Sequence, residues 1–210
     1  MKLSFTYFLV GFLFLTQIGV AQEKEKKNYK DIVKEGFIAY DSIVVSGDYE
    51  KAKASITPAF FEYISEELYV DKMNEIYNNE DFPITTYKAE NVVVGDTINV
   101  EGKYYTIITY DTHQDIPYVP KEGESKEKSQ AKFGSIRTFF KKQYGADKVE
   151  FNKKTQNFEV KLSKEAYAIS DNLAEWKFLA INIDGMEGVY RRILPEDVLP
   201  KTEEEVEVEK

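Results

Sequence analysis

The chain of 210 residues contains no cysteine. This absence excludes disulfide bonds, thiol catalysis, thiolate metal ligands and the lipid-attached cysteine of a bacterial lipoprotein. A protein of this composition must be held together by its apolar core, and the chain is long enough to bury a sizeable one.

Long apolar runs are also absent after residue 21. Before it, Lys2 is the only charge, an apolar run extends over residues 8–15, and small residues stand at Gly19 and Ala21. This order is typical of a secretory signal peptide. We therefore expect cleavage after residue 21 and export of a soluble protein to the periplasm or outside the cell. The alternative, an uncleaved anchor, is disfavoured because a span needs about 20 predominantly apolar residues.

An excess of basic residues is lacking as well. The chain has 28 Lys and Arg against 37 Asp and Glu, a net charge of −9. Removing Lys2 with the leader gives 27 − 37 = −10. An acidic chain repels a phosphate backbone and an anionic membrane surface, so we expect no nucleic-acid binding and, after cleavage, no membrane binding. Residues 22–27 are expected to form a charged flexible start, and residues 201–210 an acidic disordered tail.

Helices are predicted in the first part of the remaining chain. Apolar residues recur at three- and four-residue spacing over residues 28–46, which is typical of an amphipathic helix. A short helix is expected over residues 49–56. Thr57-Pro58 then favours the start of another helix over residues 59–78.

From residue 84 the apolar period changes to two, which predicts strands. We expect them at 84–94, 97–100, 103–112, 149–151, 158–162, 166–169 and 176–183, with helical segments at 135–144 and 186–194. The tight Glu101-Gly102 turn makes its flanking strands antiparallel. The charged segment 117–132 is expected to be a mobile loop. Helices followed by hairpins indicate a single α+β domain over residues 28–200, with N-terminal helices packed on a strongly curved antiparallel sheet.

The ordering of these elements resembles the nuclear transport factor 2-like fold, also called cystatin-like. The resemblance is carried by the long first helix, Gly47-Asp48-Tyr49, Thr57-Pro58, the aromatic strands, and Tyr167-Ala168-Ile169-Ser170 answered by Glu175-Trp176-Lys177-Phe178. The chain also resembles small exported bacterial proteins without an assigned activity. The resemblance implies a cone-like roll whose open end forms a cavity. Members of this fold include ketosteroid isomerase, polyketide cyclases and catalytically silent binding modules.

The only histidine, His113, lies between Asp111 and Asp115 at the end of a tyrosine-rich strand. In an extended strand these three side chains project to one side. Such a row could bind a divalent cation or act as acid and base. The alternative is a polar strand end entering a loop, which is favoured because a histidine metal ligand usually comes with partners and the chain has no second histidine.

Aromatic residues of the predicted strands are the other candidate site. Tyr105, Tyr87, Tyr167 and Trp176 could line a pocket that stacks on a sugar or an aromatic ligand. Ordinary strand composition is the favoured explanation, because aromatic residues favour half-buried pleated surfaces.

No motif for a cofactor is present, and no catalytic set is assembled. We therefore expect an exported, non-catalytic binding or interaction module. Its partner would be a small apolar or aromatic ligand or another envelope protein, with Asp111, His113, Trp176, Tyr167 and Tyr105 as candidate ligand-binding residues. The fold resemblance also implies pairing of two copies as a homodimer. The alternative is an isomerase- or cyclase-like enzyme that uses Asp111 or His113 as a base inside the cone.

Overall fold

The computed structural model describes residues 28–77, 83–118, 120, 122–180 and 187–199. The predicted signal peptide, the segment 22–27 and the tail 201–210 lie outside the described residues. In chain order the elements are α2 (Tyr29–Val45), α3 (Tyr49–Ala52), the 3-10 helix η1 (Lys53–Ser55), α4 (Pro58–Phe61), α5 (Glu66–Tyr77), β1 (Thr85–Thr86), β2 (Glu90–Val94), β3 (Ile98–Val100), β4 (Lys103–Pro117), α6 (Lys126–Tyr144), β5 (Val149–Asn152), β6 (Asn157–Ser170), β7 (Lys177–Ala180), α7 (Glu187–Ile193) and the 3-10 helix η2 (Glu196–Val198).

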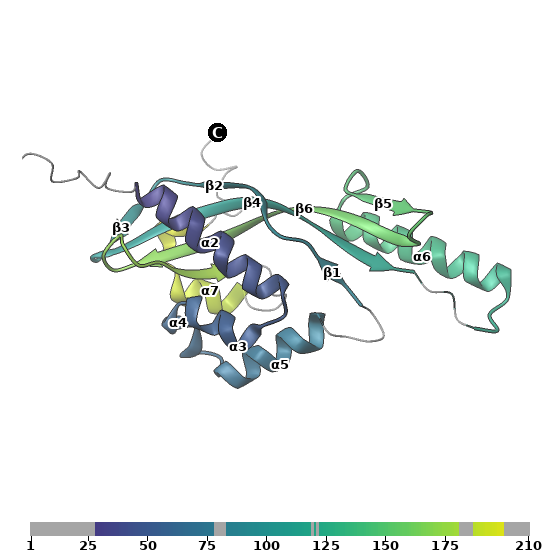
Figure 1. Ribbon diagram of the computed structural model, residues 1–210, viewed down its shortest axis with the longest axis horizontal. Helices are drawn as coiled ribbons and strands as arrows, with labels where there is room; N and C mark the ends of the chain where they lie inside the picture. Colours follow the sequence, from purple (N-terminus) through teal and green to yellow (C-terminus); the bar gives the residue numbers. More distant parts are fainter. Residues whose placement is uncertain (1–27, 78–82, 119, 121, 181–186, 200–210) are drawn as a thin grey trace, which may run out of the picture.

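Two long antiparallel strands form the spine of a seven-stranded sheet (Figure 1). β4 and β6 pair without interruption from Tyr104 opposite Ser170 to Pro117 opposite Asn157. The short strands β1, β2 and β3 pair with the other edge of β4, while β5 and β7 pair with β6. The protein is therefore α+β with an antiparallel sheet, as expected. Over the described residues this sheet is neither closed nor strongly curled.

The larger apolar cluster surrounds one half of this spine, and the N-terminal helices cover one of the two sheet faces to which its residues belong. Asn28 caps α2 by accepting a hydrogen bond from the Lys30 N–H, and the helix ends before Gly47, whose φ of 77° suits glycine. Between these ends α2 buries Val33, Phe37 and Tyr40. This first cluster also contains side chains from α3, α4, α5, α7, β2, β4, β6, β7 and η2.

A second apolar cluster lies at the other end of the spine, under α6. It consists of Ile116, Tyr118, Phe140, Val149, Phe158 and Val160, with Phe133, Ile136 and Phe151 among the half-buried residues around it. Figure 1 shows α6 and β5 at this end, away from α2–α5. The long strands therefore connect two separate cores.

The helix predicted over residues 28–46 is confirmed. The prediction of one continuous helix over residues 59–78 is wrong. Two helices, α4 and α5, occupy this segment. The Ser65 hydroxyl accepts a hydrogen bond from the Leu68 N–H at 3.1 Å, which caps a new helix start.

The predicted loop over 117–132 is also wrong in part, because α6 begins at Lys126 rather than near residue 135. Ser125 caps its first turn by accepting from the Lys128 N–H at 3.4 Å. Lysine, glutamate and glutamine are good helix formers, so a charged composition that argues against burial still permits a helix. Likewise, the strands expected at 158–162 and 166–169 form one strand, because β4 pairs along their whole length.

Among the described residues, no helix is both long and apolar enough to cross a membrane.

Candidate functional site

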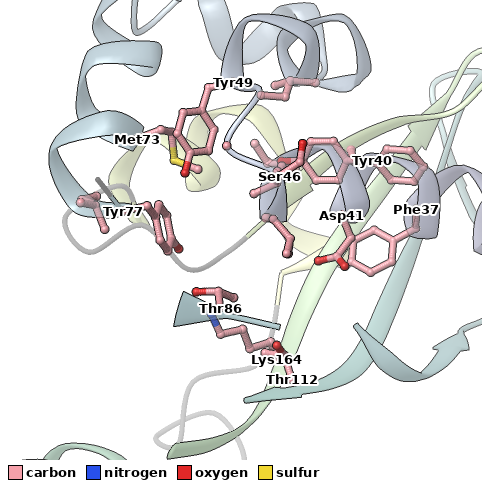
Figure 2. Close-up of a pocket in the computed structure, with 18 of the residues that line it drawn as sticks. Phe37, Tyr40, Asp41, Ser46, Tyr49, Met73, Tyr77, Thr86, Thr112 and Lys164 are labelled. Atoms are coloured by element: carbon pink, nitrogen blue, oxygen red, sulfur yellow. The ribbon is translucent and has the colours of Figure 1, made fainter. Parts of the chain in front are cut away.

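A cavity of about 310 Å³ lies between the N-terminal helices and the face of the sheet that α2 covers (Figure 2). α2 and α5 form one side of it, and β1, β4, β6 and β7 form the other. Its lining includes Phe37, Tyr40, Asp41, Val45, Tyr49, Phe60, Tyr69, Met73, Tyr77, Thr86, Tyr110, Thr112, Lys164, Phe178 and Tyr190. The first cluster therefore leaves an open space between the helices and this face of the sheet.

Aromatic rings from the helix and the sheet meet in the wall of this cavity. The Phe37 ring centroid lies 4.9 Å from that of Tyr110 and 5.7 Å from that of Phe178. Tyr40 stacks on Phe178 with centroids 5.6 Å apart and planes at 21°. Offset and edge-to-face contacts of this kind hold rings in fixed positions. This part of the wall is therefore built of aromatic rings packed on one another.

Four tyrosine hydroxyls of the lining have a pKa raised by burial, so they remain protonated at neutral pH. Burial raises the pKa of Tyr49 and of Tyr69 to about 12, and raises the pKa of Tyr40 and of Tyr190 further above the ordinary range. The Tyr190 hydroxyl donates a hydrogen bond to the Ala180 carbonyl. The Tyr69 hydroxyl is buried, and a side-chain hydrogen bond with Tyr40 acts against the rise of its pKa. None of these protonated hydroxyls can serve as a base, and the proton of Tyr190 is already donated to Ala180.

One side of the cavity is polar. Figure 2 shows Asp41 extending from α2 and Lys164 extending from β6 beside Thr86. The Asp41 carboxylate accepts a hydrogen bond from the Ala89 N–H at 2.7 Å, which fixes its position between the helix and the sheet. The Thr112 hydroxyl donates to the Tyr87 carbonyl at 2.6 Å and is thereby occupied. A carboxylate and an ammonium group thus border the same aromatic cavity.

Comparisons of the chain with protein-family models, with curated proteins and with solved structures find no match. The site is therefore interpreted from its own geometry.

Asp111 and His113 do not line this cavity. Successive side chains of a strand point to opposite faces, so Tyr110 and Thr112 face α2 while Asp111 and His113 face away from it. Asp111 accepts hydrogen bonds from Asn91 at 2.9 Å and from Ser163 at 2.8 Å. A base placed at either residue would not reach a ligand in the cavity.

The other two residues of the predicted row on β4, His113 and Asp115, both contact Tyr87. The His113 ring stacks on Tyr87, with centroids 3.8 Å apart and planes at 15°. The Tyr87 hydroxyl donates to Asp115 at 3.0 Å. Across the described residues no group of three or more His, Asp or Glu side chains is placed to hold a metal ion. The arrangement is a surface hydrogen-bond and stacking network.

The three aromatic candidates are buried in the first cluster and do not line the cavity. Tyr167 is 1% exposed, and its hydroxyl has no hydrogen-bond partner in the described part of the chain. Trp176 packs against Tyr29 and donates to the Leu173 carbonyl at 3.1 Å. Tyr105 is 6% exposed on the same face of β4 as Asp111. The structure thus places the five predicted residues outside the cavity that it forms.

The two aspartates on opposite faces of the sheet have opposite electrostatic environments. Burial raises the pKa of Asp41 from its ordinary value of 3.8, and this outweighs the Ala89 hydrogen bond and the positive charges of Lys164 and Lys88. Hydrogen bonds from Asn91 and Ser163 lower the pKa of Asp111. Ionisation of Asp41 therefore destabilises the folded state, whereas ionisation of Asp111 stabilises it.

We expect Asp41→Asn and Asp111→Asn to change the pH dependence of stability in opposite directions. Because the pKa of Asp41 is raised in the folded state, its contribution to the free energy of unfolding falls as pH rises through its titration. The stability of Asp41→Asn should therefore increase relative to that of the wild type between about pH 4 and about pH 7. Asp111 contributes stability above its unfolded-state pKa that is lost as pH falls through its lower folded-state pKa, so Asp111→Asn loses relative to the wild type as pH rises from about 2 to about 4. Urea unfolding at the two ends of each interval measures these differences, and changes of equal sign with rising pH would contradict the assignment.

Proposed function

We propose that the protein is a non-catalytic binding module that takes a small, largely apolar ligand into the cavity between α2, α5 and the sheet. The observation that carries this proposal is the aromatic wall of Phe37, Tyr40, Tyr110 and Phe178 around a space of about 310 Å³. Small-molecule sites are concave, mostly apolar, and contain a few fixed polar groups. This cavity has each of these properties.

The lining also indicates the kind of ligand. A volume of about 310 Å³ is near the lower end of the roughly 300–1,000 Å³ found for small-molecule sites, so the ligand is compact. The ring faces favour an aromatic or alicyclic body. Asp41, Lys164 and Thr86 on one side would receive a polar end. We therefore propose a compact amphipathic molecule with a ring system.

The same proposal includes export of the protein through a cleaved signal peptide. It also includes the nuclear transport factor 2-like fold with its cone-like roll, which the resemblance implies. The resemblance implies a cone whose open end forms a cavity, and the cavity described above lies between α2, α5 and the strands. Pairing with a second copy or with another envelope protein would involve other surfaces.

An isomerase- or cyclase-like enzyme is the second candidate, with Asp41 in the role of base. It is supported by the position of this carboxylate in the cavity lining and by the upward shift of its pKa on burial. The two candidates differ in one result. Asp41→Asn would abolish turnover of a bound substrate in an enzyme, whereas a binding module would return its ligand chemically unchanged.

The neutral fluorescent probe N-phenyl-1-naphthylamine tests the binding site. We expect the wild type to bind it and Val45→Trp to bind it at least about tenfold more weakly, because a larger side chain in the lining occupies the space of the ligand. Ile38→Trp is the matched control: it introduces the same residue on α2, at a 41% exposed position outside the lining. A fluorescence titration of each variant measures the dissociation constants.

His113→Ala provides a second control, because its side chain lies on the other face of β4, and it should bind the probe as the wild type does. Equal affinity of Val45→Trp and the wild type, with both folded by circular dichroism, would contradict the proposed site. Loss of binding in Ile38→Trp would show that the probe binds elsewhere.

A further inference from the structure

Helix α6 is strongly basic in an otherwise acidic chain. All of its charged residues except Glu127 are lysine or arginine, although the chain carries a net charge of −9. α6 lies at one end of the long axis, opposite the N-terminal helices (Figure 1). The net charge therefore conceals a local positive surface.

One side of α6 combines three lysines with an exposed aromatic ring. The residues of this side follow one another at alternating spacings of four and three, which aligns them along the helix. They are Lys128, Lys132, Ser135, Phe139 and Lys142, and we call them the α6 stripe. Phe139 is 61% exposed, in contrast to its neighbour Phe140, which is 6% exposed.

The residues of the stripe do not belong to the second cluster. The residues of α6 that contact the second cluster are Phe133, Ile136, Phe140 and Tyr144. Among the described residues, no ion pair joins a lysine of the stripe to a carboxylate. Both the positive charge and the ring are thus available to another surface.

We propose that the α6 stripe docks on the surface of a bilayer that contains anionic lipids. Lysines near such a surface are attracted to the headgroups, and an aromatic ring between them enters the boundary between headgroups and acyl chains. The acidic surface of a second copy would supply negative charge for the lysines, but it would also need a pocket that fits the Phe139 ring. A bilayer accepts the ring at any point, and is therefore the occupant that fits both features.

The acidic remainder of the chain does not prevent this contact. At physiological ionic strength the Debye length is about 8 Å, whereas a helix of 19 residues extends for roughly 28 Å. Charges on the far end of the molecule are therefore largely screened at the stripe. This is why the expectation of no membrane binding, which rests on the net charge alone, need not hold at α6.

Vesicle co-sedimentation tests the proposal. The protein is mixed with vesicles of phosphatidylcholine alone or of equal parts phosphatidylcholine and phosphatidylglycerol, and binding is taken as the difference between the two. We expect the combined variant Lys128→Gln, Lys132→Gln, Lys142→Gln to bind about a hundredfold more weakly than the wild type, and Phe139→Ala several-fold more weakly. The matched control carries Lys34→Gln, Lys51→Gln and Lys103→Gln, which remove the same charge from exposed positions elsewhere.

Equal losses in the two triple variants would overturn the proposal, since binding would then follow net charge rather than the stripe. Absence of a preference for anionic vesicles in the wild type would also overturn it. A third contrary result would be a wild type that does not bind vesicles but self-associates in analytical ultracentrifugation, with the stripe variants abolishing that self-association. The occupant of the stripe would then be a second copy. Val45→Trp should bind vesicles as the wild type does, which separates this proposal from that for the cavity.

Discussion

Phe158→Ala should lower the free energy of unfolding by about 3–5 kcal/mol, the range for truncating a fully buried phenylalanine. Phe158 is 1% exposed. Its ring centroid lies 5.0 Å from Phe151, 5.2 Å from Phe133 and 5.3 Å from Phe140. Since two of these rings belong to α6, the substitution removes the centre of the contact between α6 and the sheet.

Urea unfolding of the variant and the wild type measures this loss, and hydrogen exchange locates it. Because the two clusters lie at opposite ends of the spine, amides of α6, β5 and the adjoining part of β6 should lose protection first. Phe139→Ala is the matched control: the same truncation on α6 at a 61% exposed position should change stability by no more than about 0.5 kcal/mol. Similar effects of the two variants would contradict the described packing of α6.

The elements that could be predicted from the sequence are those with a strong local signal. α2 has an apolar period, the Asn28 cap and Gly47 at its end, and the Glu101-Gly102 turn permits only one strand arrangement. The start of α6 has a weaker signal, because Ser125 becomes a recognisable cap only when the charged residues after it are helical. The continuity of β6 depends on pairing with β4, which is a long-range contact.

The cavity could not be predicted for a specific physical reason. Alternation along β4 shows that its odd and even residues face opposite sides, but it does not show which side the helices cover. Tyrosines stand on both sides, with Tyr105 on one and Tyr110 on the other, so residue type did not decide between them. The interpretation based on Asp111, His113 and Tyr105 selected the face away from α2.

The polar side of the cavity had no sequence signal of any kind. Asp41 lies on a helix and Lys164 on a strand far along the chain, and only the packing of α2 on the sheet brings both to one cavity. The basic α6 stripe, by contrast, was readable from its spacing once the helix was recognised. It was missed because segment 117–132 was interpreted as a loop and the charge was summed over the whole chain.

Phe37→Ala should likewise lower the free energy of unfolding by about 3–5 kcal/mol. The side chain is 1% exposed on α2, and its ring contacts Tyr40, Tyr110 and Phe178 at centroid distances of 6.3, 4.9 and 5.7 Å. Truncation removes the ring that joins the helix to both strands of the cavity wall. Ile38→Ala, at the neighbouring 41% exposed position, should differ from the wild type by no more than about 0.5 kcal/mol.

The same substitution has a second consequence, because Phe37 lines the cavity as well as the core. The space left by its ring is continuous with the ligand site, so N-phenyl-1-naphthylamine should still bind the folded variant and raise its unfolding midpoint with the logarithm of probe concentration above the dissociation constant, as a ligand of the native state does. Thermal unfolding with and without the probe measures this rise. If the probe raises the unfolding midpoint of Ile38→Ala but not that of Phe37→Ala, then the Phe37 ring is needed for the ligand site to form and does more than line it.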